Sequence, residues 1–277
     1  MVTSPATFNA NEISQNASLE ILQPITLHTF LYPPYFEERG DGAYSGISHH
    51  VVSEVFREAG YRPVFSVYPY KRTMRNFLEE RDGIMMGLME GVPDYRLREL
   101  SQIDYMVFRT RYFYNATLKP HLSNVRHLTD TKGSRVSVLS GSATFIDTIR
   151  RSRGVPVEVV GEHQVLLLAQ RGRTDFAYTG TLTALNHIRN NPELDQLKFL
   201  PTEVSRTEGG LVFKPGAYPV RDKITRVLRR FHKEGRLHSI YSDALKNFQP
   251  ITAEELLTDS ITIRTNHPID RALRDEP

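Results

Sequence analysis

Apolar residues along this chain alternate between short runs typical of strands and longer stretches with helical spacing. Residues 27–31 predict a strand, and the segment Tyr32-Pro33-Pro34-Tyr35 ends it, because tandem prolines cannot continue a hydrogen-bonded ladder. Between Ile47 and Gly60 apolar positions recur at helical spacing, and the glycine is typical of a helix C-terminus. The first unit is therefore predicted as strand, loop and helix.

The same succession repeats along the chain. Further strands are predicted at 64–68, 84–86, 136–139, 157–160, 176–178 and 211–213, and further helices around 74–78, 145–149, 166–168, 182–188 and 220–231. Alternating units of this kind predict an α/β protein with open, mostly parallel sheets, whose ligand crevices lie at the carboxyl ends of the strands. Beyond about Leu257 the sequence is polar and irregular, and we expect a tail on the surface there.

Length and composition narrow the class of protein. A chain of 277 residues suits two lobes of ordinary domain size. Hydrophobic residues make up 39% and charged residues 24%, which argues against general disorder. No apolar run reaches the roughly 18 residues of a membrane span. The absence of cysteine excludes disulfide frameworks, thiolate zinc sites and cysteine nucleophiles.

The net charge of +3 does not indicate a nucleic-acid partner. Pairs of arginines such as Arg150-Arg151 and Arg229-Arg230 fall in separate segments, and we expect them on solvated helix faces. A single guanidinium in a cleft is a different matter, because its planar fork matches a carboxylate.

The N-terminal residues carry no export signal. The stretch from Met1 to Asn16 lacks the basic start and apolar segment of a signal peptide. We expect a mature extracytoplasmic chain from which the signal has been removed, with a cytoplasmic protein as the alternative.

Several motifs follow one another in a characteristic order. They are Tyr32-Pro33-Pro34-Tyr35, Gly46, Tyr70-Lys71-Arg72, Asp82-Gly83-Ile84-Met85-Met86-Gly87, Arg96, residues 138–144, Gly172-Arg173-Thr174-Asp175 and Lys233-Glu234-Gly235. Over about residues 25–248 the ordered set resembles the family 3 extracellular solute-binding proteins, which include the polar amino acid receptors of ABC transporters. The resemblance implies a two-lobed clamp, each lobe a mixed, mostly parallel sheet flanked by helices, with a two-strand hinge.

The resemblance also implies where the lobes divide. Lobe 1 is expected to contain both ends of the chain, residues 1–112 and 206–277, and lobe 2 to be the inserted residues 113–205. We expect the chain to cross between them near 111–114 and 202–207.

Post-strand loops and the resemblance together supply the candidate ligand-binding residues. The aromatic rings of Tyr32, Tyr35 and Tyr70 are expected to stack on a ligand, the alternative being ordinary half-buried aromatics. The position of Arg96 implies bidentate binding of a ligand carboxylate, and the turn after residue 139 opens a helix whose N-terminus favours anions. The full candidate set is Tyr32, Tyr35, Tyr70, Arg72, Gly87, Glu90, Arg96, Ser142, Ala143, Thr144 and Tyr178.

One departure from the family pattern bears on the ligand. Amino acid receptors of the family usually place an aspartate for the ligand ammonium where this chain has Gly180. An ammonium without a negative partner is costly to desolvate, which puts an ordinary amino acid ligand in doubt unless Glu90 or Asp94 replaces the charge. Adjacent histidines on a helix point in different directions, so His49-His50 predicts no metal site. We expect no cofactor.

Three functional hypotheses remain open. The first is a transport receptor, monomeric and not an enzyme, that hands a small ligand to a membrane permease. The second is the ligand-binding sensor domain of a membrane signalling receptor, with the same binding chemistry. The third is a prephenate-type dehydratase, which certain family members resemble and which needs a general acid such as Glu90, Asp94 or Glu208. No serine-hydrolase elbow, phosphate loop or zinc-protease motif is present.

Overall fold

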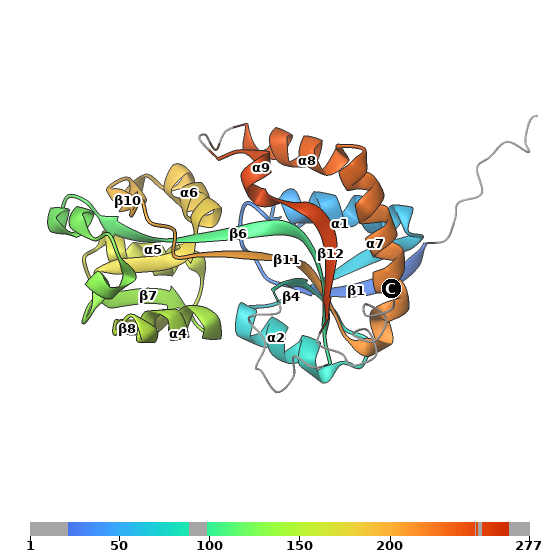
Figure 1. The fold of residues 1–277 in the computed structure, drawn as a ribbon, viewed down its shortest axis with the longest axis horizontal. Helices are drawn as coiled ribbons and strands as arrows, with labels where there is room; N and C mark the ends of the chain where they lie inside the picture. Colours follow the sequence, from blue (N-terminus) through green and yellow to red (C-terminus); the bar gives the residue numbers. More distant parts are fainter. Residues whose placement is uncertain (1–21, 89–98, 247, 249–250, 266–277) are drawn as a thin grey trace, which may run out of the picture.

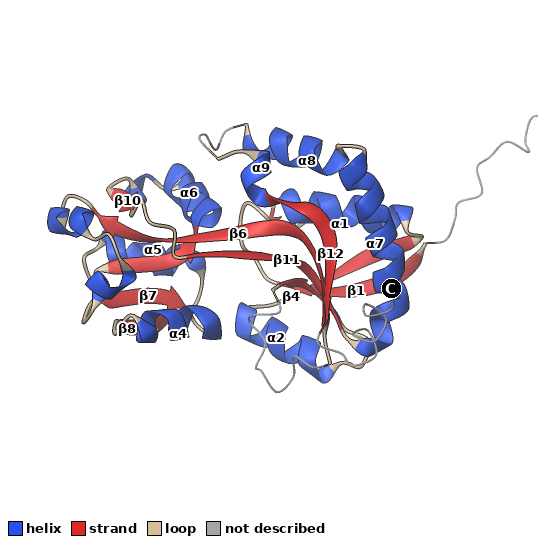
Figure 2. Cartoon of the chain, in the orientation of Figure 1, coloured by secondary structure: helices blue, strands red, loops and turns tan. Residues whose placement is uncertain are grey.

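Two α/β lobes are joined by two long strands in the computed structural model, which describes residues 22–88, 99–246, 248 and 251–265 (Figure 1). The joining strands are β6 (Ser101–Asn115) and β11 (Ser205–Phe213). Figure 2 shows the strands as a band that runs through both lobes, with the helices on the outside. The predicted α/β architecture is confirmed, and each predicted strand and helix overlaps an element of the structure.

Lobe 1 is built from segments at both ends of the described chain. Its elements are β1 (Gln23–Thr29), β2 (Glu37–Glu38), β3 (Tyr44–Ser45), α1 (Ile47–Glu58), β4 (Tyr61–Val67), α2 (Tyr70–Glu79), β5 (Ile84–Gly87), η5 (Pro215–Ala217), α7 (Tyr218–Lys233), α8 (Arg236–Leu245), α9 (Ala253–Leu256) and β12 (Leu257–Thr265). Strand β1 runs parallel to β4 on one side and to β5 on the other. Helix α2 lies on one face of this sheet, and α1, α7 and α8 lie on the other (Figure 1).

Side-chain alternation explains this layering. Successive residues of a strand point to opposite faces of the sheet. Ile84 and Met86 of β5 join the large core beneath α1 and α7, whereas Met85 between them packs with Phe77 of α2. The short apolar run 84–86 is therefore buried on both faces, as expected of a central strand in an α/β sheet.

Lobe 2 repeats the arrangement on a smaller scale. Its elements are η2 (Pro120–Asn124), η3 (Leu128–Thr131), β7 (Arg135–Leu139), α4 (Ala143–Arg151), β8 (Val155–Val159), α5 (Glu162–Gln170), β9 (Phe176–Gly180), α6 (Thr181–Asn190), η4 (Pro192–Leu194) and β10 (Leu197–Phe199). Strand β7 is parallel to both β8 and β9. Phe176 and Tyr178 of β9 pack on the α4 side, and Ala177 packs on the α5 side.

The two long strands belong to both lobes. Strand β6 pairs antiparallel with β11 from Ser101 to Thr110, and its distal part pairs with β9 of lobe 2. The β6–β11 register shifts between Gly209 and Gly210. Gly210 has φ of +154°, and a Cβ there would lie 2.2 Å from the Tyr105 ring. Glycine is required at that irregularity, because a side chain has neither the space nor the backbone freedom.

The expectation of a surface tail beyond Leu257 is wrong. Strand β12 occupies this segment and pairs antiparallel with β6. Ile261 is buried, and the Arg264 Nε lies 2.6 Å from Oδ2 of Asp104, a fully buried carboxylate on β6. Asp104, on a strand far away in the sequence, compensates the charge of Arg264. The polar residues of the segment therefore did not indicate that it is exposed.

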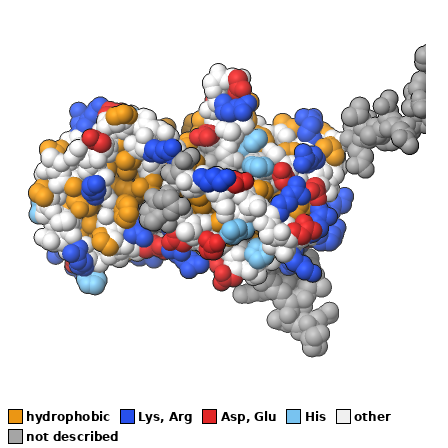
Figure 3. Space-filling model, turned by 90° about the horizontal axis from the view of Figure 1, so that it is seen from above, with side chains coloured by type: hydrophobic (Ala, Val, Ile, Leu, Met, Phe, Trp, Pro, Cys, Tyr) orange, Lys and Arg blue, Asp and Glu red, His pale blue; other side chains and the backbone are white. Residues whose placement is uncertain are grey.

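Charged side chains are spread over the surface. On the face shown in Figure 3, acidic and basic groups are interspersed rather than gathered by sign. The arginines of the α7–α8 region follow this pattern: Arg236 pairs with Glu54 and Glu58, and Arg230 also pairs with Glu58. None of the helices in the described ranges combines the length and the hydropathy that a bilayer crossing requires.

Candidate functional site

A cavity of about 150 Å³ lies between the lobes. Its lining residues are Phe30, Tyr32, Tyr70, Met85, Gly87, Leu88, Phe108, Thr110, Leu139, Ser142, Thr144, Phe145, Thr148, Glu162, Tyr178, Gly180, Thr183, Ser205 and Thr207. Residues at or just after the carboxyl ends of β1, β5, β7 and β9 are among them, as expected for ligand crevices of α/β sheets. A cavity of this size accepts a molecule of about the size of benzene.

Aromatic rings form the lobe 1 wall. The loop after β1 carries Phe30 and Tyr32, whose rings stack with centroids 4.5 Å apart, and Tyr70 at the start of α2 meets Phe30 edge-on at 4.9 Å. Burial raises the pKa of Tyr32 to about 12, so its hydroxyl is neutral at physiological pH. This wall suits packing against an apolar or π-rich ligand body.

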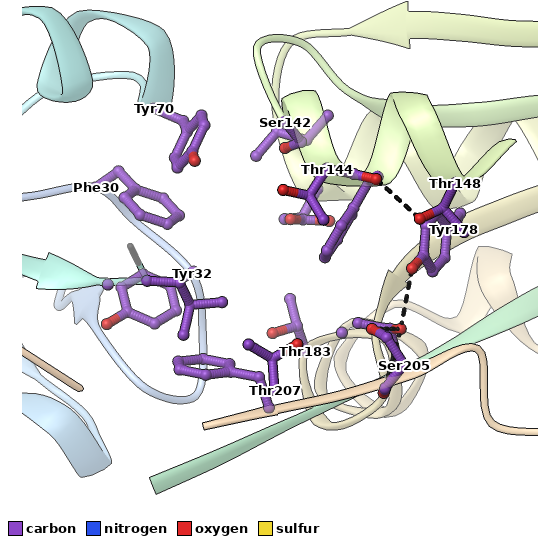
Figure 4. Close-up of a pocket in the computed structure, with 18 of the residues that line it drawn as sticks. Phe30, Tyr32, Tyr70, Ser142, Thr144, Thr148, Tyr178, Thr183, Ser205 and Thr207 are labelled. Atoms are coloured by element: carbon purple, nitrogen blue, oxygen red, sulfur yellow. Dashed lines mark hydrogen bonds between the residues drawn. The ribbon is translucent and has the colours of Figure 1, made fainter. Parts of the chain in front are cut away.

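Hydroxyl groups and two aromatic rings form the part of the lobe 2 wall near α4. Ser142 occupies the N-cap position of α4 without a side-chain capping hydrogen bond, and Thr144 lies in the first turn (Figure 4). The Phe145 and Tyr178 rings lie with centroids 4.6 Å apart. The Thr148 hydroxyl donates to the Thr144 carbonyl at 2.9 Å. This wall combines an α-helix N-terminus, which favours anions, with uncharged polar groups.

The hinge strands supply the floor of the cavity. The Thr110 hydroxyl on β6 contacts the Ser205 hydroxyl on β11 at 2.7 Å and donates to the Tyr178 hydroxyl at 3.2 Å (Figure 4). Thr207 follows Ser205 by two residues and lines the same side. A ligand here contacts both lobes and both hinge strands, so its binding is coupled to the angle between the lobes.

One carboxyl group lines the cavity among the described residues. Glu162 is the first residue of α5, is half-buried, and accepts a hydrogen bond from the Thr179 hydroxyl at 2.5 Å. The surrounding protein raises the pKa of Glu162 to about 7, because burial disfavours the charged form more than the Thr179 hydrogen bond favours it. At neutral pH this carboxyl is poised between its two protonation states.

Both rims of the cavity bring the lobes into contact. A Cβ added to Gly141, in the loop before α4, would lie 3.3 Å from Cβ of Lys71 on α2. On another side, Leu182 of α6 packs into the lobe 1 core, and the Arg189 guanidinium lies 5.6 Å from the centroid of the Phe248 ring. The structure therefore shows the lobes closed on each other.

Six of the residues predicted from sequence line the cavity: Tyr32, Tyr70, Gly87, Ser142, Thr144 and Tyr178. Three others lie outside the lining. Tyr35 is buried in the lobe 1 core between Tyr32 and Phe108, Ala143 is exposed, and Arg72 is exposed with its guanidinium 4.3 Å from the Tyr68 ring centroid. Their binding roles stay predictions.

The remaining predictions concern charged groups. Glu90, Asp94 and Arg96 lie outside the described residues. Glu208 is exposed and does not line the cavity. Gly180 does line it. Within the described ranges no group of three potential ligands, at His49-His50 or elsewhere, could hold a metal ion.

Sequence reasoning missed several lining residues. They are Phe30, Met85, Leu88, Phe108, Thr110, Leu139, Phe145, Thr148, Glu162, Thr183, Ser205 and Thr207. Glu162 was accessible to the same logic as the others, since it follows the strand predicted at 157–160. The hydroxyls of β6 and β11 carried no signal, because threonine and serine are ordinary strand and loop residues.

Comparisons with known structures identify the fold. No family model matches the chain, and no curated relative matches it. Solved structures do match. An ancestral arginine-binding protein bound to arginine is 17% identical, with 79% of this chain and 97% of that chain covered and a TM-score of 0.66. A putative L-cystine ABC transporter from Listeria monocytogenes is 15% identical, with 82% and 97% covered and a TM-score of 0.68.

A histidine kinase sensor domain with similarity to periplasmic binding proteins is 16% identical, with 80% of this chain and 96% of that chain covered and a TM-score of 0.69. The neighbours are described as binding proteins, a transporter and a sensor domain rather than as enzymes. These likenesses show that the chain has the two-lobed fold of periplasmic solute-binding proteins.

Proposed function

We propose that this chain is an extracytoplasmic solute-binding protein that captures a small carboxylate-bearing ligand between its lobes for ABC-type transport. The observation that carries the proposal is the cavity between the lobes, which takes lining residues from lobe 1, lobe 2 and both hinge strands. Such a ligand stabilises the closed arrangement by contacting both lobes at once. The fold neighbours named for arginine and cystine support an amino acid or a related organic acid.

The ligand carboxylate is assigned to the N-terminus of α4. Ser142 and Thr144 present hydroxyls there, and the positive end of the helix dipole favours negative charge. Arg96 is assigned as the second partner on the basis of its position in the sequence motif. Tyr32 and Tyr70 pack against the ligand body.

We place the lobe boundaries where the sequence motifs put them, with residues 1–112 and 206–277 in lobe 1 and 113–205 in lobe 2. The hydrophobic cores support a division between Met106, which packs with lobe 1, and Tyr112, Phe113 and Tyr114, which pack with lobe 2. We further assign the chain no catalytic role, a monomeric state, and a membrane permease as its partner in the periplasm.

A thermal-shift screen over a library of small carboxylates tests the proposal, because a ligand that binds the native state raises its unfolding temperature. We expect carboxylate hits with wild type and a loss of those shifts in Arg96→Ala. Arg151→Ala, which removes an exposed arginine on α4, serves as the matched control. Hits that are all uncharged, or an Arg96→Ala variant that binds like wild type, would show that the carboxylate assignment is wrong.

A sensor domain is the second candidate, favoured by the likeness to the histidine kinase sensor domain. The binding chemistry is the same in both cases. The full-length gene separates them: a membrane-spanning segment after Pro277 supports the sensor, and a signal peptide with a stop codon after Pro277 supports the transport receptor.

A further inference from the structure

The Glu162 carboxyl is a cavity group with no assigned role. It faces the same space as the helix α4 hydroxyls, and the other lining residues among those described are apolar, aromatic or uncharged polar. Among the described residues its hydrogen-bond partner is the Thr179 hydroxyl, which is neutral. No cation contacts it within the described part of the chain. A half-buried carboxylate without a cationic partner is an unfavourable feature that a ligand is able to relieve.

The surroundings of Glu162 suit a positively charged group. Cations are attracted to the faces of aromatic rings, and Phe30, Tyr32, Tyr70 and Tyr178 all line the cavity. The missing aspartate also bears on this point. Gly180, at the position where an ammonium partner was expected, lies on the same wall, next in sequence to the Thr179 that hydrogen-bonds Glu162. Helix α5 thus brings a carboxyl to the wall of the cavity where β9 provides none.

We propose that Glu162 binds a cationic nitrogen group of the ligand and that this contact sets the ligand class. This rests on the proposed function, since it concerns the same cavity. The ligand then carries positive charge near α5 and, under the proposed function, a carboxylate near α4. The alternative is a neutral ligand that accepts a hydrogen bond from the O–H of protonated Glu162.

Matched pairs of probes separate charge from shape. The first pair is 4-aminobutanoate and pentanoate, which share the carboxylate and differ in the terminal cation. The second pair is choline and 3,3-dimethylbutan-1-ol, which have nearly the same shape and lack a carboxylate. Calorimetric titration of the wild-type protein at pH 8, where Glu162 is mostly ionised, gives each dissociation constant. We expect the member that carries the cationic nitrogen, in at least one pair, to bind about tenfold more tightly, or better, than the member that lacks it.

Two variants locate the effect. Glu162→Gln keeps the size and the hydrogen-bond acceptor of the side chain but removes its charge, and we expect the preference for the cationic probe to disappear. Asp195→Asn removes one charge at an exposed site of the same lobe and is expected to leave the preference unchanged.

The outcomes of the two proposals differ. Equal binding of both members of each pair, no binding of either cationic probe, or a preference that survives in Glu162→Gln overturns the role of Glu162. If pentanoate binds, and 4-aminobutanoate and choline bind no more tightly than their partners without the cation, the carboxylate receptor stands and the cation site falls. If choline binds more tightly than 3,3-dimethylbutan-1-ol and neither carboxylate binds, the cation site stands and the carboxylate assignment falls.

Discussion

The half-buried carboxyl of Glu162 makes the stability of this protein depend on pH in a predictable direction. Its pKa is about 7 in the folded chain, against an ordinary value of 4.5. Between these values the folded state binds more protons than the unfolded state, so the free energy of unfolding falls as pH rises from 4.5 to 7. The stability that protonated Glu162 contributes is fully present below pH 4.5 and is lost above pH 7.

The magnitude follows from the shift. A difference of about 2.5 pH units corresponds to about 3 kcal/mol at 1.36 kcal/mol per unit. The solvent-exposed part of Glu162 and its position at a helix N-terminus both favour the ionised form, the latter by about 0.3–1 kcal/mol. We therefore expect a loss of about 1–3 kcal/mol between pH 4.5 and pH 8.

Glu162→Gln isolates this contribution, because every other titrating group is common to the two proteins. Urea unfolding of both proteins at pH 5 and pH 8 measures the free energies. We expect the variant to gain about 1–3 kcal/mol relative to wild type on going from pH 5 to pH 8. Asp195→Asn, at an exposed site, should show no such change. A difference between Glu162→Gln and wild type that is the same at both pH values would refute the assignment of a raised pKa.

Three further predictions follow from other parts of the molecule. Gly141→Ala and the control Gly133→Ala both place alanine at positive φ, +86° and +78°, and should each lose about 1–2 kcal/mol of stability in urea unfolding. Only the alanine at position 141 meets Lys71 across the cleft, so Gly141→Ala alone should lower the ligand affinity measured by titration calorimetry. An equal loss of affinity in both variants would contradict the contact between Gly141 and Lys71. Asp104→Ala removes the partner of Arg264 and should lower the free energy of unfolding in urea by about 2–4 kcal/mol. An equal loss in the control Asp259→Ala, at an exposed site, would contradict a stabilising role of the Asp104–Arg264 pair. Incubation with prephenate should leave the substrate unchanged by chromatography, and formation of product would reverse the non-enzymatic assignment.

The sequence predicted the alternating units because their signals are local. Apolar runs such as 84–86 and helical spacing such as 47–60 depend on neighbours in the chain. Strand β12 was missed because its fit is not local: Arg264 is accommodated by Asp104, which lies far away in the sequence. Polarity then suggested a tail where the structure has a paired strand.

The site was predictable to the extent that it follows strand ends. Tyr32 and Tyr35 share one loop, and nothing in their sequence context distinguishes the first, which lines the cavity, from the second, which packs into the core. Thr110 and Ser205 come together only because two strands pair across a large sequence separation. Contacts of that kind are properties of the assembled sheet.

The most direct test of the account is a crystal structure of the protein grown with the strongest hit of the carboxylate screen. We predict electron density for the compound between Tyr70 and Thr144, with its carboxylate at the start of α4 and the lobes closed around it. Density for the compound elsewhere on the surface, with this cavity empty, would contradict the central claim.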